Sequence, residues 1–267
     1  MSRIRETIAS PPFRELVGIV LHSMTWRALA WVDIRSKYRR TKLGPWWLTL
    51  SNGLMALGIG LVFGGFFGND MRTYLPFFII GMTVWGFISS ALNEAAVVLV
   101  QSGELIKATR LPLAVYVMRS VQRNFLIFLH NILIVPVIWV FVPWPLEWSM
   151  LLAVVGMGLI FIFAGAASLA IAIVCVRYRD IPPLIGMAVQ FLFFVTPIIW
   201  MPEQMRTGKL VVTLNPLGYM MSVARDPLLG RPVAPEAWAI AAAAGLLSVA
   251  VATAFYLRYR NRVVYWV

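Results

Sequence analysis

The chain has 267 residues, of which 60% are hydrophobic and 13% are charged, and its mean hydropathy is +0.80. Soluble domains are about 45–50% apolar and about 25% charged, so this composition excludes a soluble globular protein and indicates an integral membrane protein. The net charge is +12, and the single cysteine, Cys175, excludes an intrachain disulfide, a thiolate metal cluster and a CxxC redox motif.

Residues 1–45 are expected to form a cytoplasmic region that precedes the membrane domain. No apolar stretch follows its first basic residues, so we expect no cleavable signal peptide. Apolar residues recur every three to four positions over residues 11–34, which predicts an amphipathic helix in the membrane interface or, alternatively, a plain basic anchor. A basic belt follows, whose side chains would face lipid phosphates: Arg35, Lys37, Arg39, Arg40 and Lys42.

Residues 46–267 are expected to form an all-α membrane domain with six transmembrane helices. A bilayer core of about 30 Å needs roughly 20 helical residues. Six apolar stretches approach this length, and the fifth is the shortest: residues 46–67, 74–100, 124–142, 149–175, 184–200 and 236–257.

The distribution of basic residues predicts the orientation of these spans. If both termini are cytoplasmic, all of the 23 lysine and arginine residues lie on the cytoplasmic side except Arg72, Arg206, Lys209, Arg225 and Arg231. The positive-inside rule favours this topology. The topology also accounts for the basic charge without a nucleic-acid partner.

Two connecting segments are expected to be helical without crossing the membrane. Residues 102–124 are too charged to span but favour a short cytoplasmic helix, broken before Pro112, that would grip a soluble partner; a plain loop is the alternative. Residues 201–235 contain short apolar runs that suit external re-entrant helices broken at Pro216 and Pro227. These helices would form a lid or gate, with a partly ordered loop as the alternative.

The spans contain few chemical signals. The sequence has no GxxxxGK[ST], HExxH, GxSxG or Asp-x-Asp motif, so we expect a chain that is neither its own ATPase nor another enzyme. Glu94 and His130 adjoin asparagines, which favours interhelical hydrogen bonds over a proton relay. A GxxxGxxxG ladder predicts close helix packing, within one chain or between two copies: Gly60, Gly64 and Gly68.

The fifth predicted span begins beside a charged turn. Asp180 is expected either to pair with Arg177 and Arg179 or to cap the helix that two prolines begin. Polar residues and a proline within this span favour a surface that faces a watery path rather than lipid: Gln190, Thr196 and Pro197.

Three stretches in order resemble the membrane domain of type-2 ABC exporters, specifically the polysaccharide export permeases that move O-antigen, capsule or teichoic-acid chains. They are "KYRRTKLGPWWLTLSNGL" at 37–54, "VRYRDIPPLIGMAVQFLFFVTPIIW" at 176–200 and "LNPLGYMMSVARDPLLG" at 214–230. The resemblance covers essentially the whole chain. It implies a homodimer in the bacterial inner membrane that exports an undecaprenyl-linked polysaccharide, most plausibly lipopolysaccharide O-antigen.

The resemblance also implies a separate ABC ATPase subunit in two copies, which would hold ATP and Mg, whereas this chain would hold no cofactor. The surface that receives the conformational change of the ATPase subunits would comprise the N-terminal helix, the short cytoplasmic helix and the charged turn. Its expected coupling residues are Gly103, Glu104, Lys107, Arg110, Arg177, Arg179 and Asp180.

In such exporters the first and fifth spans would line the translocation path, where aromatic rings stack on sugars. The path residues expected on this basis are Trp46, Trp47, Phe63, Phe66, Gln190, Phe191, Phe194, Thr196 and Trp200. For each aromatic residue, an interface belt or ordinary packing is the alternative. The basic belt would attract the lipid pyrophosphate. An ion-coupled secondary transporter, an ABC exporter of a non-glycan substrate and a membrane glycan-processing enzyme are the alternative functions.

Overall fold

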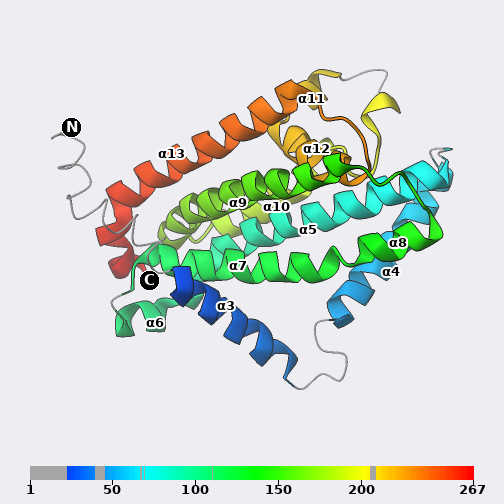
Figure 1. Ribbon diagram of the computed structural model, residues 1–267. Helices are drawn as coiled ribbons and strands as arrows, with labels where there is room; N and C mark the ends of the chain where they lie inside the picture. Colours follow the sequence, from blue (N-terminus) through cyan, green and yellow to red (C-terminus); the bar gives the residue numbers. More distant parts are fainter. Residues whose placement is uncertain (1–22, 40–45, 67, 69, 110, 205–208) are drawn as a thin grey trace.

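The computed structural model describes residues 23–39, 46–66, 68, 70–109, 111–204 and 209–267, and its regular structure over these residues is helical, with no strand (Figure 1). The first four α-helices are α3 (Ser23–Tyr38), α4 (Trp46–Phe66), α5 (Met71–Gln101) and α6 (Gly103–Ala108). They are followed by α7 (Leu113–Asn131), α8 (Ile134–Phe141), the 3-10 helix η1 (Trp148–Leu151), α9 (Leu152–Arg177) and α10 (Ile181–Val195). The last elements are η2 (Pro202–Gln204), α11 (Lys209–Leu214), α12 (Pro216–Leu228) and α13 (Pro235–Trp266).

Within the described residues, five helical stretches are long and apolar enough to cross a membrane. They are Thr49–Phe66, Met71–Gln101, Leu113–Phe141, Trp148–Arg177 and Pro235–Trp266. Four of these contain or overlap the expected spans closely, and Leu113–Phe141 begins eleven residues before the third expected span at residue 124. The chain is therefore a multi-pass membrane protein.

The fifth expected span, residues 184–200, is helical only in part. Helix α10 has 15 residues, which is about 22 Å of helix and shorter than a bilayer core of about 30 Å. It ends at Val195 because Thr196 is extended (φ −87°, ψ 138°), the conformation favoured before a proline. The residues that follow leave the helical path, so α10 covers only residues 184–195 of this expected span.

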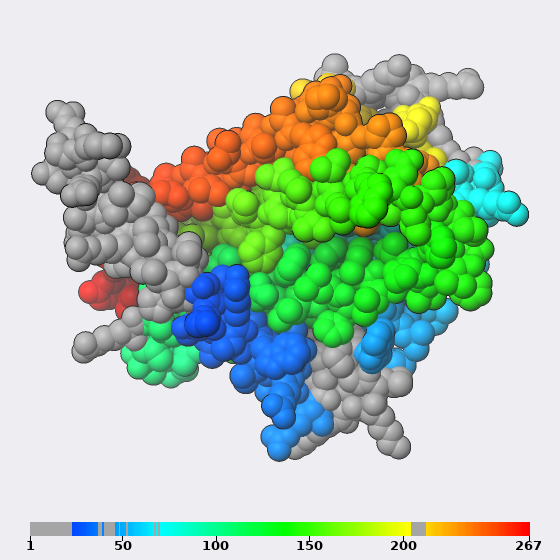
Figure 2. All heavy atoms as spheres, viewed as in Figure 1, coloured from blue at the N-terminus to red at the C-terminus, as the bar shows by residue number. Residues whose placement is uncertain are grey.

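Helix α5 is the centre of the bundle, and it contacts α4, α7, α9, α10 and α12. An aromatic cluster joins it to α7 and α9, with ring centroids 5.0 to 6.3 Å apart: Phe87, Phe125, Phe128 and Phe161. Helix α13 lies along α9, and Figure 2 shows the face on which α7, α8 and α9 form a continuous surface beside α13. This packing gives α5, α7 and α9 many shared apolar contacts.

Two glycines of the predicted ladder pack α4 against α5. A Cβ at Gly60 would lie 2.9 Å from Leu75 Cδ1, and a Cβ at Gly64 would collide with the side chain of Met71. Gly68 does not belong to this ladder: α4 ends at Phe66, and Gly68 adopts a positive φ of 63° with no atom within 4 Å of a Cβ built on it. Two of the three ladder glycines therefore lie where α4 and α5 pack closely, and Gly68 lies outside this contact.

The two ends of the bundle carry different connections. Helix α6, the turn between α9 and α10, and the C-terminus lie at one end, whereas the α4–α5 connection, α8 and α11 lie at the other (Figure 1). We name the first end the cytoplasmic end and the second the external end, after the topology that the sequence predicts.

Candidate functional site

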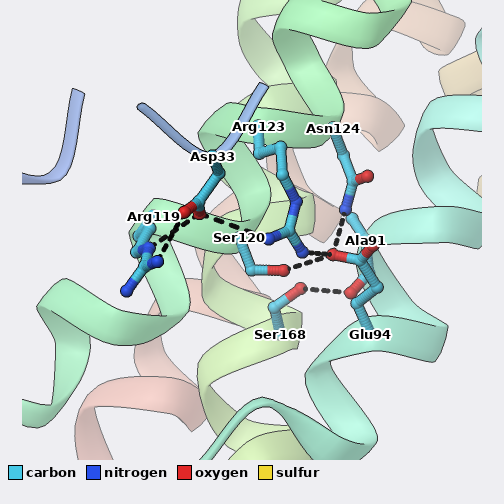
Figure 3. A network of polar contacts seen from close by, with 8 residues as sticks. All are labelled: Asp33, Ala91, Glu94, Arg119, Ser120, Arg123, Asn124 and Ser168. Carbon is cyan, nitrogen blue, oxygen red and sulfur yellow. Dashed lines mark hydrogen bonds and ion pairs between the residues drawn. The ribbon is translucent and has the colours of Figure 1, made fainter. Parts of the chain in front are cut away.

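A network of ionised side chains joins α3 to two membrane helices near the cytoplasmic end. Arg119 and Arg123 stand one turn apart on α7, so they share one face of that helix. Arg119 donates to both carboxylate oxygens of Asp33 on α3, with its Nε 2.7 Å from Oδ2. Arg123 Nη1 lies 3.3 Å from the same carboxylate (Figure 3). Helix α3 is thus held to α7 by two arginines.

Glu94 on α5 continues this network. Its Oε2 accepts hydrogen bonds from Ser120 Oγ at 2.6 Å, Arg123 Nη2 at 2.5 Å and Asn124 Nδ2 at 2.9 Å, all on α7 (Figure 3). Arg123 therefore bridges Asp33 and Glu94. Two carboxylates balance two guanidinium groups, and each side chain is between 15% and 37% exposed.

Of the two ionisable residues expected to bond between helices, Glu94 does so and His130 does not. The prediction for Glu94 is confirmed by its three partners on α7. The His130 Nδ1 lies 2.8 Å from the carbonyl of Leu126, one turn earlier in the same helix. The neighbouring Asn131 makes the interhelical contact instead, because its Oδ1 accepts from Thr49 of α4 at 3.3 Å.

At the external end, polar side chains hold the irregular chain that follows α10. Tyr74 of α5 donates to the carbonyl of Ile199 at 2.6 Å. Asn215 donates to Thr196 Oγ1 at 3.0 Å and caps α12 by accepting from the Leu217 amide. After the end of α10, the carbonyl of Ile199 and the hydroxyl of Thr196 therefore receive hydrogen bonds from side chains of α5 and of the residue before α12.

Arg225 of α12 is the centre of this external network. Its side chain is 2% exposed, and its Nη1 donates to the carbonyl of Pro197 at 2.7 Å. Its Nε donates to Asp226 at 2.9 Å, and its guanidinium lies 3.7 Å from the ring centroid of Phe77. Burial lowers the pKa of Arg225, and the carboxylate of Asp226 opposes that shift. We name the described residues 196–204 and 209–228 the external segment.

Helix α12 of the external segment begins as expected and ends later than expected. Asn215 and Pro216 start it, but Pro227 lies within its last turn, and the helix ends at Leu228 before Gly230 at φ 66°. Pro227 has no N–H to donate to the carbonyl of Val223. Gly156 of α9 lies directly against that carbonyl, so α9 and α12 approach each other closely at this point.

The expected coupling residues lie around the cytoplasmic end. A short helix, α6, does form before Pro112, with Glu104 and Lys107 exposed and Gly103 buried. Arg177, Arg179 and Asp180 are all exposed, and the guanidinium of Arg177 lies 4.7 Å from the ring centroid of Trp266 of α13. Asp180 is the N-cap residue of α10 but its side chain makes no capping hydrogen bond. Arg110 lies outside the described residues.

The expected path residues divide into exposed and buried sets. On α4, Trp46 and Trp47 are each 57% exposed and Phe66 is 80% exposed, whereas Phe63 is half-buried. On α10, Gln190, Phe191 and Phe194 are exposed. Trp200 is half-buried and donates to the carbonyl of Phe194 at 3.0 Å. Thr196 is fully buried, and its Oγ1 accepts a hydrogen bond from Asn215.

Part of the basic belt lies outside the described residues. Arg35 and Arg39 are exposed at the end of α3, whereas Arg40 and Lys42 fall in the undescribed stretch before α4. The backbone of Lys37 is part of α3. The first half of the expected amphipathic helix, residues 11–22, is likewise outside the described residues. In its second half, Trp26, Ala30 and Ile34 are buried at four-residue spacing on the face towards α7.

Sequence analysis missed the partners of both networks. The spacing of Arg119 and Arg123, four residues apart on one helix, was the available signal for the first network. For the second, Arg225 was counted only as one of five external basic residues. Its burial depends on α12 returning into the bundle between α5, α9 and α13.

Comparison with known proteins identifies the family. The profile described as ABC-2 type transporter matches residues 24–229. An O-antigen export system permease protein RfbA of Klebsiella pneumoniae is 24% identical over 233 residues, which cover 85% of this chain and 90% of that protein. A protein of the same name from Myxococcus xanthus is 23% identical over 194 residues, which cover 71% of this chain and 74% of that protein. The match over most of the chain, together with its apolar helices, shows that this permease-type membrane subunit belongs to the ABC-2 type transporter family.

Proposed function

We propose that this chain is the permease subunit of an ATP-driven exporter of a lipid-linked polysaccharide, of the O-antigen class, in a bacterial inner membrane. The family match and the relatives named as O-antigen export permeases support this assignment. Two copies of the chain would form the conduit with both termini in the cytoplasm. Two copies of a separate ABC ATPase subunit would bind ATP and Mg.

The observation that carries the proposal is the charge network that links α3 to α5 and α7. Asp33 is held by Arg119 and Arg123, and Arg123 also holds Glu94, so a displacement of α3 would act directly on two membrane helices. An interface helix that only anchored the chain to lipid would not need this link. The network also engages Glu94 in ion pairing, which removes the main residue that would support an ion-coupled transporter.

In the proposed cycle, the basic belt at the end of α3 attracts the pyrophosphate of the lipid-linked glycan on the cytoplasmic side. Binding of ATP closes the ATPase subunits, which displaces α3 and α6. The exposed aromatic residues of α4 and α10 would face the glycan across the dimer and provide stacking surfaces without fixing one sugar stereochemistry. The external segment would form the exit of this conduit.

The test is export by cells that lack this chain. Deletion should abolish the glycan at the cell surface and accumulate its lipid-linked form in the inner membrane, and re-expression should restore export. Scrambling residues 102–110 in the re-expressed chain should uncouple the ATPase activity of the partner from export while the chain remains inserted. Normal surface glycan in the deletion strain, or with the scrambled segment, would contradict the proposal.

A further inference from the structure

The end of α13 extends beyond the length needed to cross a membrane. The helix has 32 residues, which corresponds to about 48 Å, whereas a bilayer core is about 30 Å thick. Its apolar part gives way at Arg258 to a segment that carries Arg260 and Arg262. We name residues 256–267 the C-terminal segment, which lies at the same end of the bundle as α6 (Figure 1).

The C-terminal segment contacts two of the three elements that are expected to receive the movement of the ATPase subunit, namely α6 and the charged turn after α9. A Cβ at Gly103 of α6 would lie 2.6 Å from Val267 Cγ1, so the absence of a side chain at Gly103 admits the chain end. On its other side, Trp266 lies against Arg177 and against Tyr259, with the Tyr259 ring 5.9 Å away. Tyr256 and Val263 are almost fully buried. The segment is therefore a packed part of the bundle that joins α6 to the end of α9.

A groove of about 480 Å³ lies between this segment and the joint of α6 and α7. Apolar residues of α6, α7 and their connection form one wall of the groove. Helix α13 forms the other wall and contributes a guanidinium group, an amide and phenol groups. The residues that define its character are Ile106, Thr109, Tyr256, Arg260, Asn261 and Tyr265. Among the described lining residues, Arg260 carries a positive charge and none is acidic.

The surroundings of the groove are also basic. The described charged residues of α6, the α9–α10 turn and the C-terminal segment comprise six cations and two anions: Lys107, Arg177, Arg179, Arg258, Arg260 and Arg262 against Glu104 and Asp180. A concave surface with an apolar wall and a positive rim is complementary to a protein segment that presents an apolar and an acidic side chain together. A soluble partner that bound the exposed side of α6 would lie next to this groove, because Ile106 of α6 lines it.

We propose that the groove between α6 and the C-terminal segment is a docking site for an acidic segment of the ATPase subunit. This inference rests on the proposed function, because it needs that subunit as the occupant. It extends the coupling surface to the chain end, which sequence analysis did not include. Through Val267 and Trp266, binding in the groove would act on α6 and on the α9–α10 turn together.

The experiment compares two arginines of the same helix. The chain is co-expressed with its ATPase subunit and purified in nanodiscs, and the retained ATPase subunit and its activity are measured. Arg260→Glu should lower the retained subunit about tenfold. Arg258→Glu changes the charge equally but lies outside the groove lining, so retention should stay within about twofold of wild type. Retention of the subunit by Arg260→Glu at the wild-type level would overturn the inference.

A second measurement keeps the inference testable if Arg260→Glu fails to fold. A photo-crosslinking residue at Tyr265, which is 86% exposed, should capture the ATPase subunit, whereas one at Leu247 in the membrane part of α13 should not. Crosslinks from Tyr265 to lipid alone would overturn the inference in favour of an anionic lipid site. If the wild-type chain retained no ATPase subunit, the proposed function would fail as well, which distinguishes the two failures.

Discussion

The two ends of this membrane protein use arginine in different ways. At the external end, one almost completely buried guanidinium, Arg225, bonds a backbone carbonyl and an adjacent carboxylate and packs on a ring. At the cytoplasmic end, Arg119 and Arg123 bond the carboxylates of Asp33 and Glu94. Glu94 also accepts hydrogen bonds from two neutral side chains. All four charged side chains are partly exposed.

The difference indicates which end can move. A buried cation that loses a partner is left with an uncompensated charge, which costs several kcal/mol, about 3 to 5. Arg225 therefore favours the single arrangement of the external segment in which its partners are in place. Partly exposed ion pairs exchange partners at low cost, because water solvates each charge during the exchange. The cytoplasmic network is thus suited to transmit a displacement of α3, while the external network holds the chain after α10 in place.

The largest effect is expected from Arg225→Met. Methionine retains the apolar volume but leaves the carbonyl of Pro197 and the carboxylate of Asp226 without their donor, so we expect a loss of about 3 kcal/mol in the free energy of unfolding. Chemical denaturation in detergent measures it. Arg231→Met is the control, because Arg231 is only half-buried. Equal effects of the two substitutions would remove the distinction between the ends.

A second test of the external end uses two glycines of α9. A Cβ at Gly156 would overlap the backbone carbonyl of Val223, whereas a Cβ at Gly158 has no atom within 4 Å. Gly156→Ala should therefore destabilise the protein by about 2 kcal/mol, because α9 and α12 must separate. Gly158→Ala should be neutral or stabilise by up to about 1 kcal/mol. Thermal unfolding measures the melting temperatures of both variants. Similar melting temperatures for Gly156→Ala and Gly158→Ala would contradict the close approach of α9 and α12.

At the cytoplasmic end, a double-mutant cycle of Asp33→Ala and Arg119→Ala should give a coupling energy of about 1 to 2 kcal/mol. Since both side chains are partly exposed, the coupling energy should fall by about one half when the salt concentration is raised from about 0.05 M to about 0.5 M. Denaturation curves at the two salt concentrations measure it. Additive single effects would show that α3 is not held by this pair, and a salt-independent coupling would remove the contrast with Arg225.

The smallest effect is expected at the start of α12. Asn215→Ala removes both the cap on the Leu217 amide and the donor to Thr196, for a loss of about 1 kcal/mol in stability. Asn215→Asp is the matched control, because it keeps the capping oxygen and loses only the donor, so its effect should be smaller. If aspartate were as damaging as alanine, the bond to Thr196 rather than the cap would hold the start of the helix.

Individual residues show why sequence predicted some of these features and not others. Gly60 and Gly64 were assigned to close packing because small residues at four-residue spacing share one helix face, and that face does meet α5. Gly68 has the same spacing but lies after the end of α4, and spacing does not reveal where a helix ends. Thr196 is polar within an apolar stretch, which suggested a watery path. Its partner Asn215 lies 19 residues later, beyond the range of any local pattern.

By itself, the sequence determined that the chain is a helical membrane protein, where most of its long helices lie and where short helices interrupt the connections. Those properties follow from local hydrophobicity, charge and proline positions, which act over one or two helical turns. Only the tertiary structure decided that Asp33, Arg123 and Glu94 meet and that Arg225 is buried against Phe77. It also decided that the chain end packs between α6 and α9. These contacts join residues far apart in the chain, and they depend on how the helices pack rather than on the character of each helix.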